Sequence, residues 1–124
     1  MIGEVWNIRV PYYDKVKKAM GFKVRPAIII ANADADDYVV IPVSKVSDPS
    51  KIDPVYDVPV DPAQYPMLGL TVKSYIRTHK QTVVHTTLIS KCLGDIKVNY
   101  EELFLEVLEK REDFSKSITE QAIR

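Results

Sequence analysis

The 124-residue sequence predicts a mainly β protein, a small β-barrel followed by a C-terminal α-helix, as a single domain over residues 1–124. Two observations support this fold class. About six or seven apolar segments of strand length are separated by turns rich in Pro, Gly and Asp. One later segment instead spaces its apolar side chains as a helix does. We expect the barrel over about residues 3–96, the helix over about 99–111 and a tail over 112–124.

The first predicted strand covers residues 3–10. Glu4, Trp6, Ile8 and Val10 are expected on one face, and Val5, Asn7 and Arg9 on the other, which predicts a strand with one apolar face. Pro11 is expected to end this strand.

Residues 11–24 are basic and aromatic. An amphipathic helix with Val16, Ala19 and Met20 on one side is one interpretation, but we favour a long, mobile loop. Such a loop offers aromatic rings for stacking on unpaired bases and ammonium groups for the phosphate backbone. A solvated, lysine-rich loop is the alternative. The RNA-binding candidates in it are Tyr12, Tyr13, Lys17, Lys18 and Lys23.

The second strand contains Ile28, Ile29 and Ile30 in succession, which favours a strand buried on both faces. Pro26 precedes this run, and it holds Arg25 in an extended conformation. Arg25 is therefore fixed at the rim of a rigid element. It is a candidate for binding an anion, and the alternative is a charge at the strand end in solvent.

The remaining strands are expected over residues 38–44, 55–60, 70–77, 81–84 and 91–96, with a helical turn over 86–90. Pro42 suggests an edge or a bulge in the first of them, and Gly94 a bulge in the last. The segment 55–60 has the features of an edge strand. The segment 81–84 either continues the preceding strand or pairs with it.

The C-terminal helix is predicted from its cap and its periodicity. Asn99 is the expected N-cap and Glu102 its reciprocal partner. A short second helix could start at Ser117, or this end could fray. The apolar residues at helical spacing are Tyr100, Leu103, Phe104, Val107 and Leu108.

Composition excludes several classes of protein. The formal net charge is zero, yet the chain has five cations and no acid between Lys15 and Arg25. Cys92, the single cysteine, cannot form an internal disulfide, and its apolar neighbours predict a buried, unreactive thiol. No Cys/His spacing suggests a metal site, and no apolar run reaches transmembrane length. We expect a cytoplasmic protein without a cofactor.

Five segments together resemble the MazF/PemK (Kid) toxins of bacterial toxin–antitoxin pairs. They occur in the family's order, with matching gaps, between about Gly3 and Lys110. The five segments are Gly3-Glu4-Val5-Trp6, Arg25-Pro26-Ala27-Ile28-Ile29-Ile30, Pro42-Val43-Ser44, Ile76-Arg77-Thr78 and Leu93-Gly94-Asp95-Ile96.

The resemblance implies an SH3-like barrel of the MazF/PemK/CcdB type that forms a homodimer. It also implies metal-independent, sequence-selective cleavage of single-stranded RNA (mRNA). In that reaction the ribose 2′-OH attacks the adjacent phosphodiester and leaves a 2′,3′-cyclic phosphate and a 5′-hydroxyl. A cognate antitoxin protein, with a disordered segment lying over the RNA groove, would neutralise such a toxin.

The resemblance also suggests which residues form the site. Arg25 matches the family's Arg-Pro arginine, and its planar fork suits a phosphate. Ser44 matches a threonine and can donate to a phosphate oxygen, or it can bond the backbone. Arg77 is expected to support the groove or the dimer. Glu4 is expected to orient Arg25 or a nucleotide, or to be an ordinary edge-strand glutamate.

The sequence departs from the family where a general base is expected. Many relatives have a carboxylate at the position of Ser74. His79 and His85 are candidate replacements because imidazole titrates near neutrality, and His79 is the better one. Two other hypotheses remain open: a non-catalytic barrel that binds RNA or a peptide in the same groove, and an interaction module that uses the helix over residues 100–108.

Overall fold

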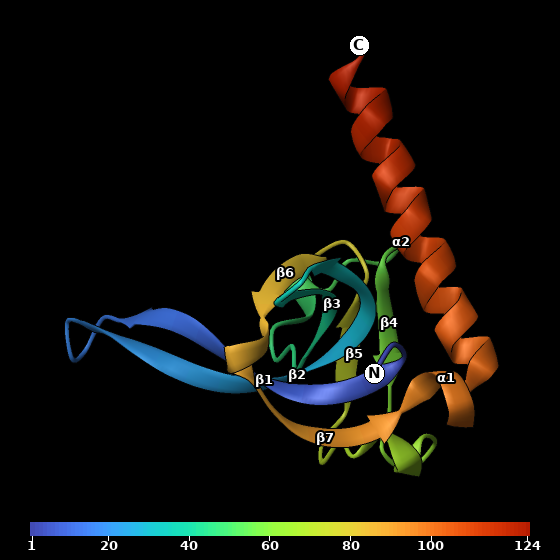
Figure 1. Ribbon diagram of the computed structural model, residues 1–124. Helices are drawn as coiled ribbons and strands as arrows, with labels where there is room; N and C mark the ends of the chain where they lie inside the picture. The colour runs from blue at the N-terminus through green and yellow to red at the C-terminus, as the bar shows by residue number, and fades with distance from the viewer.

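The computed structural model describes residues 1–124 and confirms a mainly β fold, a small barrel with a C-terminal helix (Figure 1). The strands are β1 (Glu4–Asp14), β2 (Ala19–Asp34), β3 (Asp37–Ser44), β4 (Asp57–Val60), β5 (Ser74–Arg77), β6 (Thr82–His85) and β7 (Ile89–Asp95). The helices are α1 (Ile96–Asn99) and α2 (Glu101–Ala122), with single 3₁₀ turns η1 (Pro49–Lys51), η2 (Pro66–Leu68) and η3 (Thr86–Leu88). No helix is both long and apolar enough to cross a membrane.

All strand pairs are antiparallel, in the order β4-β5-β3-β2-β1-β7, and the sheet curls into a half-barrel. One edge of β3 pairs with β2. The other edge pairs with β6 as far as Val40 and with β5 from Val43 onward. Pro42 lies at this change of partner, where a residue without an N–H group costs little. The segment 81–84 therefore pairs with β3 and not, as one expectation had it, with the strand before it.

The core has two parts, on opposite faces of the sheet. Ile28 belongs to a larger cluster between the sheet and α2, and Ala27 and Ile29 belong to a smaller cluster on the other face. This confirms that β2 is buried on both faces. β1 is also apolar on both faces, because Val5 packs in the larger cluster and Ile8 in the smaller one. The prediction of one apolar face was wrong here, because the sheet curls around Val5.

The bulge expected at Gly94 is present. β1 pairs Val5 with Gly94 and Trp6 with Cys92, so Leu93 is the extra residue in β7. Gly94 leaves no space for a side chain, because an added Cβ would lie against the Met67 carbonyl of η2.

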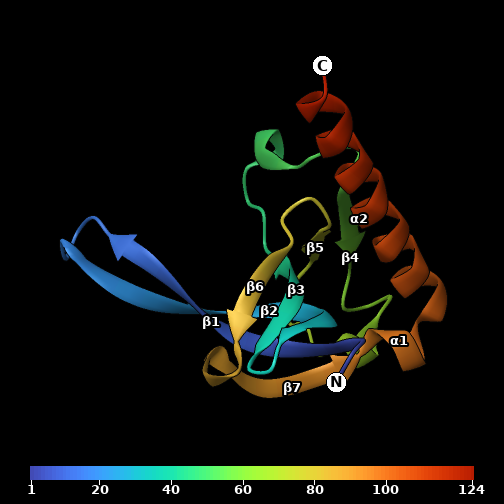
Figure 2. The same ribbon diagram turned by 45° about the horizontal axis from the view of Figure 1, so that its top comes forward.

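Residues 11–24 do not form a loop, and this expectation was wrong. β1 and β2 continue as a two-stranded ribbon, with Pro11 opposite Phe22 and Tyr13 opposite Met20. Pro11 does not end β1, because β7 pairs with β1 only as far as Ile8 and its edge is open beyond that point. We call this ribbon, residues 10–24, the arm. It projects from the barrel in both views (Figures 1 and 2).

The C-terminal helix begins and ends at other residues than predicted. Asp95, not Asn99, caps a helix: its carboxylate accepts a hydrogen bond of 2.9 Å from the Val98 N–H of α1. α2 begins at Glu101 and continues to Ala122 without a break at Ser117. The stretch after residue 111 contains neither Gly nor Pro, so nothing local ends the helix. Its buried residues lie in the first turns, Phe114 packs against Tyr56 of the barrel, and the last turns extend past the barrel (Figure 1).

Candidate functional site

Arg25 and Ser44 lie at matching positions at the end of the β2–β3 ladder. The last bridged pair is Ala27 and Pro42, and the two candidates each stand two residues further on in the antiparallel register. Because side chains alternate between faces, both lie on the face of the smaller core cluster. Tyr75 of β5 is paired directly with Ser44 and completes this row. The two residues proposed from sequence thus occupy corresponding register positions, just beyond the last bridged pair of the ladder.

Neither Arg25 nor Ser44 has a partner within the chain. Arg25 makes no salt bridge, and none of the side-chain hydrogen bonds involves Arg25 or Ser44. The alternative in which the Ser44 hydroxyl bonds the backbone is therefore not what is observed. Both side chains are half-buried; Ser44 ends β3, whereas Arg25 lies within β2 and not at its end as expected, because β2 continues into the arm. The guanidinium and the hydroxyl are available to an external group.

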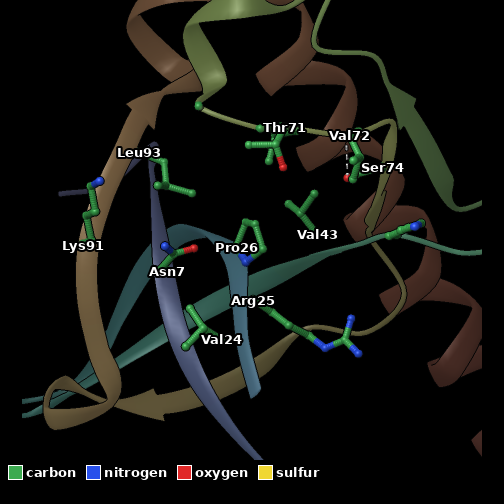
Figure 3. A pocket seen from close by; sticks show the side chains of 13 residues that line it. Asn7, Val24, Arg25, Pro26, Val43, Thr71, Val72, Ser74, Lys91 and Leu93 are labelled. Carbon is green, nitrogen blue, oxygen red and sulfur yellow. Dashed lines mark hydrogen bonds between the residues drawn. The ribbon is translucent and has the colours of Figure 1, made fainter. Parts of the chain in front are cut away.

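A cavity of about 450 Å³ lies on the opposite face of the sheet from this row, and Arg25 is the member of the row that lines it. Its walls include Asn7, Pro26, Val43 and Leu93, which surround a common space (Figure 3). The Arg25 guanidinium points away from them, at the rim.

The charged side chains that line this cavity are all cations: Arg25, Lys45 and Lys91. We define these three residues as the cationic rim. No carboxylate lines the cavity, so it favours an anion. Sequence reasoning missed Lys45, although it directly follows Ser44, and Lys91, which reaches the site from β7.

Ser74 does not take the place of a catalytic base. It precedes Tyr75 in β5 and so lies on the opposite face from Ser44. Its side chain is buried, and its hydroxyl donates a 3.0 Å hydrogen bond to the Val72 carbonyl (Figure 3). Ser74 therefore lines the cavity, but its hydroxyl proton is already used in a hydrogen bond within the protein.

Arg77 and His79 belong to a separate cluster around Asp57. Arg77 donates from Nε to the Asp57 carboxylate at 3.1 Å and from Nη2 to the Lys51 carbonyl at 2.9 Å. The His79 Nδ1 atom is 3.8 Å from the same carboxylate. Neither residue lines the cavity beside Arg25, so His79 is not brought to the Arg25–Ser44 row. His85 caps η3, where its Nδ1 accepts a hydrogen bond from the Thr87 N–H.

Glu4 does not orient Arg25. Its carboxylate accepts a 3.3 Å hydrogen bond from Trp6 Nε1 and lies 3.4 Å from the N-terminal amine. Arg25 is paired with Ile8, four residues further along β1, which is about 13 Å at the rise of a strand. The role in orienting Arg25 that was expected for Glu4 is not observed.

Cys92 is exposed and not buried, contrary to the expectation from its apolar neighbours. Its Sγ lies 3.7 Å from the Glu4 carboxylate. Partial burial of the sulfur, and then the negative charge of Glu4, raise the pKa of the Cys92 thiol. The thiol is therefore a weak nucleophile despite its exposure. No group of three or more His, Cys, Asp and Glu side chains is arranged to hold a metal ion.

The arm carries the predicted RNA-binding residues on two different faces. Lys23 places its ammonium 4.4 Å from the centre of the Tyr12 ring, a cation–π contact on one face. Tyr13 is exposed on the other face, opposite Met20. Lys17 and Lys18 lie at the tip, in a turn held by the Asp14 carboxylate, which accepts a hydrogen bond from the Lys17 N–H. A two-stranded ribbon thus replaces the loop that was expected.

The sequence matches no known protein-family profile, and no curated protein is significantly similar to it. The resemblance to MazF/PemK toxins rests on the five sequence segments alone and remains an expectation.

Proposed function

We propose that this protein is the toxin component of a toxin–antitoxin pair and cleaves single-stranded RNA without a metal ion. The observation that carries the proposal is the corresponding register of Arg25 and Ser44, both unpartnered, together with a cavity whose charged lining residues are three cations, Arg25 among them. The 2′-OH of one ribose would attack the adjacent phosphodiester. A 2′,3′-cyclic phosphate and a 5′-hydroxyl would result.

Arg25 and Ser44 would bind the scissile phosphate. The guanidinium offers paired N–H donors that match two phosphate oxygens, and the hydroxyl donates to an oxygen as well. Stabilising the charge that develops on the phosphorane is commonly the largest single term in such catalysis. The cationic rim would attract the neighbouring phosphates, and the exposed Tyr13 ring would stack on a base.

The test is incubation of the purified protein with single-stranded RNA in EDTA, followed by analysis of the product ends. We expect 2′,3′-cyclic phosphate and 5′-hydroxyl ends. Arg25→Ala should lower the rate about 10²–10³-fold, the usual cost of removing a group that stabilises transition-state charge. Arg124→Ala, at the C-terminus and remote in sequence from the site, is the matched control and should leave the rate unchanged. Intact RNA with the wild-type protein would contradict the proposal.

A second candidate is a barrel that binds RNA without cutting it. The observation that favours it is the absence of a carboxylate or an imidazole among the residues lining the Arg25 cavity, which leaves no side chain to act as general base. It predicts binding that weakens steeply with salt while the RNA stays intact. The assay in EDTA separates the two candidates directly.

The proposed partners are mRNA, a cognate antitoxin protein and a second copy of the chain in a homodimer, in the cytoplasm. Induction in a bacterium should arrest growth for the wild type but not for Arg25→Ala. Equal growth of the two would contradict the toxin assignment. A short neighbouring reading frame with a DNA-binding half and an acidic, disordered tail would identify the antitoxin, and light scattering would give the oligomeric state.

A further inference from the structure

A second cavity lies at the other end of β5, where the loop after η1 meets the turn into β6. Its volume is about 490 Å³, and it shares no lining residue with the cavity beside Arg25. Four of its side chains carry nitrogen donors: Lys51, Arg77, His79 and Lys80. We call this cavity the β5–β6 bowl.

The carboxylates near the bowl are already occupied. Asp57 has a fully buried side chain and accepts hydrogen bonds from Arg77 Nε and Nη2 and, at 2.8 Å, from the Asp53 N–H. Asp53 accepts hydrogen bonds from the N–H groups of Val55 and Tyr56. The hydrogen bond from Tyr56 is the main cause that lowers the pKa of Asp53. Both carboxylates therefore accept hydrogen bonds from groups within the protein, and the ammonium groups of Lys51 and Lys80 make no salt bridge.

Arg77 is anchored and still has donors to offer. Its Nε and Nη2 atoms bond Asp57 and the Lys51 carbonyl, whereas Nη1 has no partner in the chain and is not fully buried. The guanidinium is thus held in one orientation by protein contacts, with one free edge. Fixed orientation lowers the entropic cost of binding a ligand.

His79 has one buried and one accessible nitrogen. Nδ1 is buried without a hydrogen-bond partner, 3.8 Å from the Asp57 carboxylate, and it is the single such orphaned side-chain atom in the protein. Nε2 makes no hydrogen bond and is not buried. Tyr56 and Phe114 flank the ring, with centroids 6.1 Å and 6.0 Å from its centre. A proton on Nδ1 would point at a carboxylate, and Nε2 would then donate on the accessible side.

We propose that the β5–β6 bowl binds a phosphoryl group, taken up together with a proton on His79. Lys51, Lys80, the free edge of Arg77 and His79 Nε2–H would donate to its oxygens. Protonation would relieve the orphaned Nδ1 by pairing it with Asp57. The other charged groups that face His79 are Asp53 in the bowl and, from α2, Arg111, which lines a smaller cavity on the ring's other side.

The site is independent of the proposed cleavage reaction, because it shares no residue with the Arg25 cavity. The chain has two histidines, so their ring signals are readily separated by NMR, with His85→Asn for assignment. We would titrate the protein with inorganic phosphate, and with sulfate as a dianion of constant charge, from pH 5.5 to 8. Sodium chloride at equal ionic strength is the control. Both tetrahedral anions should move the midpoint of the His79 titration to higher pH, and sulfate, whose charge is constant over this range, should bind at least several-fold more tightly at pH 6 than at pH 8.

The variant Lys51→Gln/Lys80→Gln should lose this response, whereas the matched variant Lys45→Gln/Lys91→Gln should keep it. His79→Gln should bind weakly and with no pH dependence beyond that of the anion itself. Arg77 is left intact, because its removal would strand the buried Asp57.

An unchanged His79 signal in phosphate and sulfate, or an unchanged response in Lys51→Gln/Lys80→Gln, would overturn the proposal. An oligonucleotide with a 5′-phosphate, compared with its 5′-hydroxyl form in the Arg25→Ala background, distinguishes a strand end from a free ion. Tighter binding of the phosphorylated form would assign the bowl to a strand end. Equal binding would assign it to free phosphate.

Discussion

Asp57 and Arg77 are directly opposite each other on β4 and β5, and the buried carboxylate accepts hydrogen bonds of 3.1 Å and 3.2 Å from the guanidinium. The Asp57 side chain is fully buried, so its charge depends on this partner. Removing one member of a buried ion pair leaves an uncompensated charge.

Arg77→Met should therefore lower the free energy of unfolding by about 3–5 kcal/mol. The double variant Asp57→Asn/Arg77→Met should lose less than Arg77→Met alone, because no buried charge is left unpaired. Urea denaturation measures both, and Lys80→Met, an exposed neighbour, is the control. A cost for Arg77→Met no greater than that of the control would show that the pair does not stabilise the fold.

Gly94 is tightly enclosed at the β7 bulge. A Cβ there would lie against the Met67 carbonyl and 3.2 Å from the Leu68 Cα, both backbone atoms that cannot turn aside. Gly94→Ala should cost about 1–3 kcal/mol, as overpacking does. Gly21→Ala in the arm is the matched control, because its Cβ would meet the movable Tyr12 ring at 3.2 Å. Thermal unfolding should show a lower midpoint for Gly94→Ala than for Gly21→Ala, and equal midpoints would contradict the prediction.

The lysines at the tip of the arm should set the salt dependence of RNA binding. If Lys17 and Lys18 each contact one phosphate, Lys17→Gln/Lys18→Gln should reduce the slope of log K against log salt by about 1.4, or ~0.7 for each contact. Fluorescence anisotropy with a labelled single strand at several salt concentrations measures the slope. Lys97→Gln/Lys116→Gln, on the helices, should leave it unchanged. A slope that does not respond to the arm variant would exclude these contacts.

The exposed ring of Tyr13 should contribute by stacking and not through its hydroxyl. Tyr13→Ala should weaken RNA binding by about 1–3 kcal/mol, the usual value for one stacked base, whereas Tyr13→Phe should retain the affinity. The ring has no hydrogen bond in the chain, so the change should leave stability nearly unaltered. Equal losses for the two variants would indicate a contact made by the hydroxyl.

Cys92 should react slowly for an exposed thiol. Partial burial and the Glu4 carboxylate raise its pKa, and the thiolate is the reactive form, so the thiolate fraction near neutral pH is low. Glu4→Gln should speed its reaction with an aromatic disulfide reagent at pH 7.5 by about 2–5-fold, as a shift of a fraction of a pKa unit would. Glu102→Gln, on α2, is the control. No acceleration in Glu4→Gln would mean that burial alone raises the pKa.

The local sequence pattern was sufficient to predict the buried strand β2 and the bulge in β7. Three successive isoleucines predicted the two-sided burial of β2, and Gly94 predicted a bulge, because β-branched residues and glycine act through their own backbone preferences. Arg25 and Ser44 were also identified from sequence motifs, although only Ser44 lies at a strand end, because β2 begins at Ala19. Their relative position depends on the register of β2 and β3. The motifs imply that register only if no bulge separates the two residues from the last bridged pair, Ala27 and Pro42.

Other features depended on contacts between distant segments. Sequence reasoning made residues 11–24 a loop, because Pro11 and the lysines disfavour a strand; pairing between β1 and β2 outweighs that preference. It also expected Arg77 to support the groove or the dimer and His79 to replace the general base. Instead, the buried carboxylate of Asp57 holds Arg77 in a second cluster, with the His79 ring beside it. Nothing in the residues around Asp57 signals its burial. The sequence alone thus determined the mainly β fold, the two-sided burial of β2 and the candidate anion-binding residues. Tertiary packing decided the arm, the second apolar face of β1 and which charges meet, because a buried charge must find its partner across strands.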